Sequence, residues 1–183
     1  RLLVRGDGLR DLGYVSGGAW RYRLHAGIVP DLLLRATDGH GNVVAFSYAP
    51  LTAAAYTRHS DARYPSQDYA GSLPVVTSLS VSDGAGGTQR LAFSYYGGRS
   101  NLQGRGFEGF DARLAVDERN GLRQWQYYNR DFPLTGTPRR AVLAQSGEVA
   151  VTRSDITWST HSYGTGAQAR HFAYVSATSR TSN

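Results

Sequence analysis

The sequence predicts an all-β protein built from tandem antiparallel β-hairpins. Apolar and polar residues alternate along several segments, as in strands that pack on one face. Turn-forming sequences rich in Gly, Asp and Asn separate those segments. The composition agrees, because 22 Gly and 12 Tyr are typical of a turn-rich β protein, and 40% hydrophobic with 19% charged residues indicates a folded chain.

Four segments show the alternation most clearly, and each is expected to form a strand with one apolar face. In chain order, the residues predicted to share the apolar face are Val44, Phe46 and Tyr48; Val75, Thr77, Leu79 and Val81; Leu91, Phe93 and Tyr95; and Phe110, Ala112, Leu114 and Val116.

Turn signals stand between these strands, at residues 37–42, 82–87, 118–122 and 145–149. Asn120-Gly121 is the strongest of them, since both residue types tolerate a positive φ angle. A loose repeat links two of the hairpins, because "TDGHGNVVAFSY" and "SDGAGGTQRLAFSYY" share a turn followed by a strand that ends in A-F-S-Y. Such units stack on their neighbours, because one hairpin cannot bury its own apolar face.

Three regions depart from this pattern. Residues 49–74 predict a long connection, with one helical turn at residues 53–56. The first thirty residues contain a Gly-Asp-Gly loop followed by two short strands. Near the end of the chain, "HSYGTGAQAR" is typical of a loop, and "HFAYVSA" predicts a last strand.

Charge and composition argue against several classes of partner. The net charge is +6, but the basic residues are all Arg and are scattered singly, apart from Arg139-Arg140. A nucleic-acid surface usually clusters its basic residues, so no nucleic acid is expected. No segment predicts a membrane span. The absence of Cys excludes disulfides and thiolate chemistry, and the absence of Met leads us to expect a fragment of a longer polypeptide.

The stretch "NLQGRGFEGF" contains a G-x-G-x-x-G at residues 104–109, the letters of a dinucleotide-binding fingerprint. That fingerprint needs a buried strand before the first Gly and a helix that begins at the last. Here a polar loop precedes the motif and a strand pattern follows it, so no cofactor is expected, although Asp131 lies at about the spacing of a ribose contact. We expect a glycine-permitted corner between two strands, anchored by Phe107 and Phe110.

The remaining polar residues predict no catalytic site. His59, Ser60 and Asp61 are adjacent, whereas the members of a catalytic triad converge from separate elements. Asp111, Asp117 and Glu118 could pair in space, but nothing in the sequence indicates that they do. The five His residues lack metal-ligand spacing; they are His25, His40, His59, His161 and His171. We therefore predict no enzyme, no catalytic residues and no cofactor.

One loop has partial calcium-binding character. Asp7 and Asp11 fit the later half of a D-x-N-x-D-G-x-x-D loop, but Leu3 and Arg5 occupy the first two ligand positions. An Arg at such a position repels a divalent cation, so we predict an ordinary turn and no metal ligand.

The aromatic residues leave one binding function open. Trp20, Trp125 and Trp158 could stack on sugars, which would make the chain a carbohydrate- or surface-binding β module. Core packing and cross-strand pairing are the alternative roles for these three side chains.

With these residues laid out, the chain resembles a family of bacterial toxin proteins. The segment "VRGDGLRDLGYVSGGAWRYRL" resembles a degenerate FG-GAP repeat, the Asp-Gly-rich unit of certain β-propellers. Residues 31–136 resemble the middle region of the B component of Tc insecticidal toxin complexes, which SpvB-like and RHS (YD-repeat) proteins share. The most specific letters are the Tyr and Gly run into G-R-G-F-x-G-F, and the "DFPLTG" after it.

The resemblance implies a non-catalytic scaffold. In that family the hairpins form the wall of a hollow shell that encloses a toxin domain, and the neighbouring propeller docks on a translocating component. We therefore expect residues 1–29 to be a propeller remnant and residues 30–183 to be an RHS-like β-hairpin region. The expected partners are the rest of the parent polypeptide and its toxin domain, and the expected location is secreted.

Overall fold

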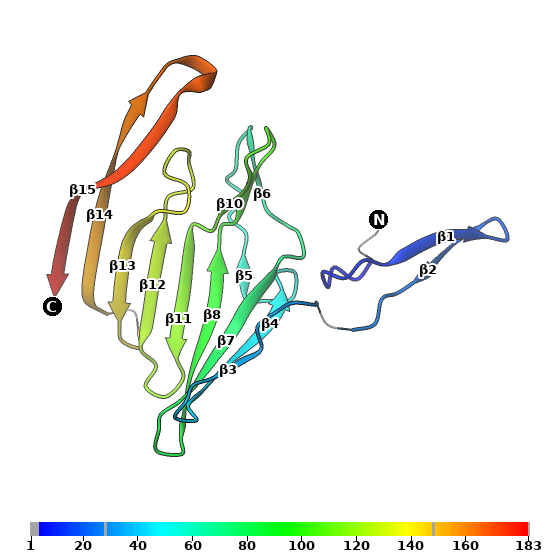
Figure 1. The fold of residues 1–183 in the computed structure, drawn as a ribbon, viewed down its shortest axis with the longest axis horizontal. Coiled ribbons are helices and arrows are strands. Elements are labelled where there is room, and N and C mark those ends of the chain that lie inside the picture. Colours follow the sequence, from blue (N-terminus) through cyan, green and yellow to red (C-terminus); the bar gives the residue numbers. More distant parts are fainter. Residues whose placement is uncertain (1–3, 28, 148, 183) are drawn as a thin grey trace. The chain divides into compact units, whose positions relative to one another are not determined.

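The computed structural model describes residues 4–27, 29–147 and 149–182. Strands make up 56% of the structure, and the strand pairs of the described residues are antiparallel, so the predicted all-β hairpin fold is confirmed (Figure 1). The helical content of the described residues is one short 3-10 turn, η1 (Gly166–Gln168). Two compact units divide the chain, one of residues 1–56 and 70–91, the other of residues 57–69 and 92–183.

The first unit contains a two-stranded hairpin and part of a larger sheet. The hairpin pairs β1 (Leu12–Ser16) with β2 (Ala19–Arg23), which confirms the two short strands predicted near the start. The sheet strands follow in the order β3 (Arg35–Thr37), β4 (Val43–Pro50), β7 (Pro74–Ser82) and β8 (Thr88–Tyr96), and the second half of β8 belongs to the other unit.

A β-bulge changes one predicted face. Tyr48 pairs with Val76 and Ser47 with Ser78, so Thr77 is the extra residue on β7. The four residues from 75 to 81 therefore do not share one face, because the bulge reverses the alternation at its position. Val75 instead lies opposite Ala49 and is buried.

The second unit continues with hairpin after hairpin. From β8 the sheet runs through β11 (Ala112–Asp117), β12 (Arg123–Tyr128), β13 (Pro138–Ala144), β14 (Ala150–Tyr163) and β15 (Arg170–Ser182). A second, three-stranded sheet has the order β10 (Gly106–Gly109), β9 (Arg99–Asn101) and β6 (Ser66–Asp68). Neighbours in sequence are thus mostly neighbours in the sheet, as the short loops require.

The turns fall where the sequence places them. Gly121 has a φ angle of +70°, but Asn120 keeps a negative φ and instead accepts the Leu122 N–H through its side chain at 2.9 Å. The Asn-Gly pair therefore sits in a longer loop than a two-residue hairpin turn.

The long connection at residues 49–74 differs from its prediction. A hydrogen-bonded turn closes from Pro50 to Ala54, earlier than the helical turn expected at residues 53–56, and Tyr56 begins β5 (Tyr56–Thr57), which pairs with β8. The segment also supplies β6 to the small sheet. Near the other end of the chain, His161 to Tyr163 belong to β14, so the predicted loop is shorter than the sequence indicates.

Burial is low for a chain of this length. The buried apolar side chains among the described residues are Leu9, Leu51, Val75, Tyr95, Ala112, Leu114, Ala115 and Ala144. In the second unit, four of the six residues of β11 are buried, whereas β15 at the end of the sheet is almost wholly exposed. None of the described helical residues forms a segment long and apolar enough to cross a membrane.

Candidate functional site

The G-x-G-x-x-G stretch lies at the β9–β10 hairpin. Its first Gly belongs to the turn after β9, and its last ends β10, after which the chain enters β11. A helix N-terminus, which binds a pyrophosphate through its free N–H groups, is not formed at this position. The predicted corner between strands is confirmed, and the nucleotide-loop geometry is absent from these residues.

Three glycines of the motif take φ angles that side chains rarely adopt, at +95° for Gly104, +76° for Gly106 and +87° for Gly109. The pairing register shifts between Phe107 and Gly109, which leaves Glu108 at an irregularity of the ladder. The glycines therefore permit the change of direction that carries the chain from the small sheet into β11.

Aromatic rings hold this corner, as the sequence predicts. Phe107 contacts Phe110 edge-to-face with ring centroids 5.3 Å apart, and Tyr69 with centroids 5.0 Å apart. Phe110 in turn packs on the buried Tyr95 at 4.8 Å. The burial of Tyr95 raises the pKa of its hydroxyl, which keeps it neutral. The rings connect the small sheet to β8.

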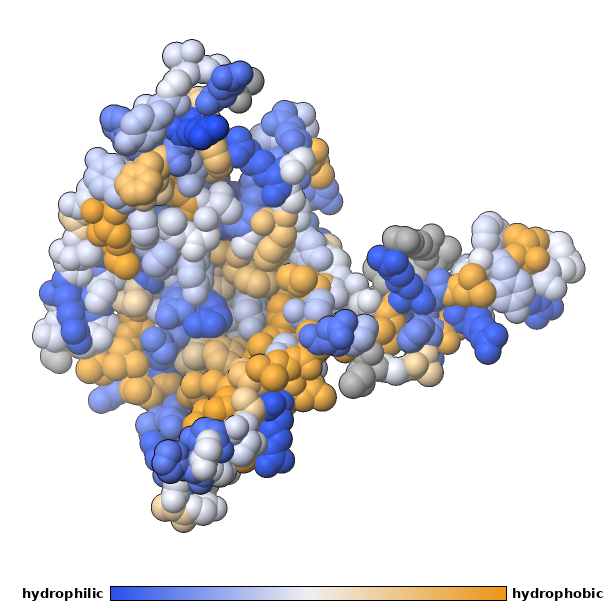
Figure 2. Space-filling model, viewed as in Figure 1, coloured by the Kyte–Doolittle hydropathy of each residue, from blue (hydrophilic) through white to orange (hydrophobic). Residues whose placement is uncertain are grey.

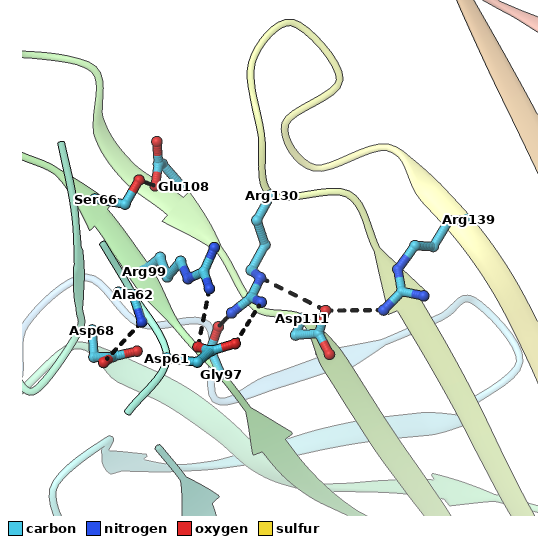
Figure 3. A network of polar contacts seen from close by, with 10 residues as sticks. All are labelled: Asp61, Ala62, Ser66, Asp68, Gly97, Arg99, Glu108, Asp111, Arg130 and Arg139. Carbon is cyan, nitrogen blue, oxygen red and sulfur yellow. Dashed lines mark hydrogen bonds and ion pairs between the residues drawn. The ribbon is translucent and has the colours of Figure 1, made fainter. Parts of the chain in front are cut away.

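A carboxylate is buried in the corner, which the sequence alone does not indicate. Glu108 is 6% exposed, and one of its oxygens accepts a hydrogen bond from the Ser66 hydroxyl at 2.7 Å (Figure 3). The other accepts a hydrogen bond from the Asn101 amide at 3.2 Å. These partners come from β6 and β9, the other two strands of the small sheet. Glu108 thus ties all three strands together.

Beside it, Asp61 fastens the long connection. Arg99 donates to Asp61 at 3.0 Å, and a second guanidinium, that of Arg130, lies 3.6 Å away (Figure 3). The Arg99 hydrogen bond holds the pKa of Asp61 below its ordinary value. Arg130 also donates to the Gly97 carbonyl at 2.8 Å.

The same cation reaches a second carboxylate. Arg130 lies 3.6 Å from Asp111, which Arg139 also contacts at 3.0 Å. Arg130 is 11% exposed, so these ion pairs are partly shielded from solvent. The network of Asp61, Arg99, Arg130, Asp111 and Arg139 connects residues 57–69 to four other segments of the same unit.

Two atoms of this region have no hydrogen-bond partner among the described residues. They are Asp68 Oδ1 and Arg99 Nε, on residues that lie directly opposite each other in β6 and β9. An activated nucleophile needs a base and an orienting group within hydrogen-bond reach, whereas this network consists of carboxylates and guanidinium groups in mutual contact. Its arrangement suits fastening rather than acid–base chemistry.

The His-Ser-Asp sequence at residues 59–61 forms no triad. Ser60 adopts a positive φ of 60°, and Asp61 faces Arg99 and Arg130. Gly97 leaves room for the His59 ring, because a Cβ at residue 97 would lie 2.5 Å from His59 Nδ1. His59 is therefore a packing residue at the edge of the polar network.

A serine–histidine contact that the sequence does not reveal lies elsewhere in the second unit. The Ser162 hydroxyl and His171 Nδ1 are 2.8 Å apart across the β14–β15 pair. The other described contact of the His171 ring is Phe132, with centroids 5.1 Å apart. Hydroxyl activation requires a group that orients the base, and an aromatic ring edge does not supply it.

The three carboxylates considered for pairing are dispersed. Asp111 joins the Arg network, while Asp117 is buried at the end of β11, where it accepts the Arg119 N–H. Glu118 lies in the turn that follows, and Asp131 lies in the loop before β13. No group of three or more His, Asp or Glu side chains could hold a metal ion within the part of the chain that the structure describes.

In the first unit, the Gly-Asp-Gly loop uses its carboxylates internally. Asp11 is 5% exposed and accepts the N–H groups of His25 at 2.9 Å and Val4 at 2.8 Å, which lower its pKa. Asp7 accepts the Leu9 N–H at 3.0 Å. Leu3, the first position of the degenerate calcium pattern, lies outside the described residues. Asp11 thus joins the two ends of the β1–β2 hairpin.

The three Trp residues occupy different surroundings. Trp20 is 66% exposed on the β1–β2 hairpin, where apolar surface is visible in orange in Figure 2. Trp125 is half-buried between Tyr96 and Tyr127, and Trp158 donates its indole N–H to the Pro138 carbonyl at 2.7 Å. Trp125 and Trp158 have cross-strand packing roles, which leaves Trp20 as the exposed one of the three.

Comparison with known proteins found no matching family model and no significant match among curated proteins.

Proposed function

We propose that this chain is a structural wall segment of an RHS-type β-shell that encloses a toxin domain. In this proposal it is a non-catalytic part of a secreted toxin polypeptide. Its partners are the flanking parts of that polypeptide, the enclosed domain and a translocating component. The resemblance of residues 31–136 suggests the family, and the physical support comes from the sheet itself.

The observation that carries the proposal is the exposed area. The accessible surface of the chain is 12054 Å². A compact monomer of 19.9 kDa exposes about 8,700 Å², and two separate globular units with this division would together expose about 10,400 Å². The chain therefore exposes roughly 1,600 Å² more than even two independent domains would. Such an excess of accessible surface is expected of a single-layer sheet whose faces are covered only in a larger assembly.

The distribution of burial supports the same function. β11 is well buried, while β14 and β15 carry large exposed side chains, among them Tyr163, Phe172 and Val175. A free-standing domain would cover its last hairpin with a further layer. In a wall, the next hairpin pairs with the free edge of β15, which ends the sheet.

The polar network has a clear role in such a wall. A long insertion such as residues 49–74 would weaken a sheet if it moved freely. Asp61, Arg130 and Glu108 fasten it by charge and hydrogen bonds instead of by a second hydrophobic core. This suits a one-layer sheet, which offers few apolar residues to bury it.

The test compares the chain alone with the chain extended by its flanking sequence. Translation of the coding DNA on both sides should reveal further hairpin repeats downstream and propeller repeats upstream. The extended protein should protect β15 amides from hydrogen exchange, whereas in the isolated chain they exchange quickly. A stop codon shortly after residue 183, or protection that does not change on extension, would contradict the proposal.

A further inference from the structure

The last hairpin extends beyond the rest of its sheet. β13 pairs with residues 150–155 of β14. Beyond Asp155, the strand that pairs with β14 among the described residues is β15. Residues 156–163 and 170–178 thus form a two-stranded ribbon (orange to red in Figure 1). An isolated two-stranded ribbon is marginally stable in water, so its side chains are informative.

One face of the ribbon is anchored. Trp158 donates to the Pro138 carbonyl at 2.7 Å, and the His171 ring meets Phe132 edge-to-face. Ser162 lies on the same face, bonded to His171. These contacts attach the ribbon to the start of β13 and to the loop before it, and so fix which face is turned outward.

The opposite face is open and aromatic. The cross-strand pairs on it are Ser159 with Tyr174, His161 with Phe172, and Tyr163 with Arg170, and we call these six residues the ribbon platform. Tyr163 is 59% exposed, Phe172 60% and Tyr174 45%. Solvent-facing strand positions usually carry polar residues, so three large aromatic side chains on one face indicate a binding surface.

The rings are arranged for stacking. Phe172 and Tyr174 are nearly parallel, with planes 19° apart and centroids separated by 6.4 Å, so both rings offer a similarly oriented face to a ligand. The negative face of an aromatic ring attracts C–H groups, and the C–H face of a pyranose is flat and apolar. Ser159, His161 and Arg170 bring hydrogen-bonding groups to the edge of this surface.

The charge of the ribbon selects among such ligands. Residues 156–177 contain Arg170, His161 and His171 and lack Asp and Glu. An anionic group on the ligand would therefore meet a guanidinium donor without a competing carboxylate on the ribbon. Single-stranded nucleic acid also stacks on aromatic rings, but its binding requires a positive groove that follows the backbone, and the platform has a single Arg.

We propose that the ribbon platform binds an acidic saccharide, with Phe172 and Tyr174 stacked on sugar rings and Arg170 paired with a carboxylate or sulfate. This binding would lie outside the wall function and does not rest on it. It places sugar binding on the last hairpin, whereas the sequence alone suggested Trp20, Trp125 or Trp158 for that role.

The experiment titrates the 183-residue chain with three acidic probes: a galacturonate hexasaccharide, a hyaluronan hexasaccharide and a sialylated trisaccharide. A galactose hexasaccharide is the neutral control, and a single-stranded oligonucleotide is the competing polyanion. Saturation-transfer NMR would detect contact between aromatic protons and the sugar. We expect at least one acidic probe to bind about tenfold more tightly than the neutral one.

Matched variants separate the platform from other causes. Phe172→Ala with Tyr174→Ala should lower that affinity about tenfold or more, while Phe172→Tyr with Tyr174→Phe keeps both rings and should retain it. Arg170→Gln should remove the preference for the acidic probe, and Trp20→Ala should change nothing. The proposal is overturned by a lack of binding to all three acidic probes, by binding that survives loss of both rings, or by tighter binding of the oligonucleotide than of any sugar.

Discussion

Two glycines with similar backbone angles allow the polar network to be tested by one small change. Gly97 and Gly106 have φ angles of +59° and +76°, so an Ala at either position costs about 1–2 kcal/mol in backbone strain. A Cβ on Gly106 would meet nothing within 4 Å. A Cβ on Gly97 would lie 2.5 Å from His59 Nδ1 and 3.0 Å from Arg130 Nη1.

The added methyl group of Gly97→Ala must therefore displace both side chains. The Arg130 hydrogen bond to the Gly97 carbonyl would be lost, at a cost of about 1.5–3 kcal/mol for a bond to a charged group that is largely buried. We expect Gly106→Ala to reduce the free energy of unfolding by about 1–2 kcal/mol, and Gly97→Ala by about 3–5 kcal/mol.

The assay is urea denaturation at one fixed protein concentration, because association would make stability depend on concentration. Intrinsic tryptophan fluorescence reports the transition, and Trp125, which packs on Tyr96 in the second unit, contributes to it together with Trp20 and Trp158. Adding His59→Ala to Gly97→Ala should restore part of the loss. Equal destabilisation by the two Gly→Ala changes would refute the reasoning, because it would leave strain as the sole effect.

Three further outcomes follow from the same region. Glu108→Ala should cost about 1–3 kcal/mol in urea denaturation because it leaves buried donors unpaired, whereas Glu108→Gln keeps an acceptor oxygen and should cost less than about 1 kcal/mol. Since the pKa of Asp61 is lower in the fold than its unfolded value of about 3.9, its stabilisation is present above that value and lost as the pH falls through the folded pKa. Melting temperatures measured from pH 6 to about pH 3 should therefore fall less steeply for Asp61→Asn than for the unaltered chain; parallel profiles would speak against it. Phe110→Ala should destabilise by about 3 kcal/mol, more than Phe107→Ala, because Phe107 is 40% exposed; the reverse order in thermal melts would show that the corner is anchored differently.

The local signals of the sequence predict the fold class and most hairpins. Alternation and glycine turns depend on neighbouring residues, so segments such as β4, β8 and β11 were predictable. The bulge at Thr77 was not, because it depends on which residue of β4 faces it. The helical turn expected at residues 53–56 is misplaced for the same reason, because the pairing of β5 with β8 takes Tyr56 into a strand and the turn closes earlier, at Ala54.

The sequence predicted the glycine corner of the candidate site, but it did not predict the network of charged side chains beside it. The glycines and the two Phe residues of "GRGFEGF" indicate a turn with aromatic anchors. The hydrogen bond between Glu108 and Ser66 spans 42 positions of the chain, and the ion pair between Asp61 and Arg130 spans 69. Nothing in the sequence marks either pair. The ribbon platform could not be predicted for a similar reason. Which face of the ribbon stays open depends on the loop that covers the opposite face, and that contact joins residues far apart in the sequence.

The wall proposal is tested most directly by the association state of the chain on its own. Light scattering over a dilution series, with a dye that binds exposed apolar surface, measures whether the roughly 1,600 Å² of excess surface is left uncovered. We expect the isolated chain to associate as its concentration rises and to bind the dye strongly, and we expect both effects to be suppressed when the flanking hairpins are added. A stable monomer that binds no dye would contradict it.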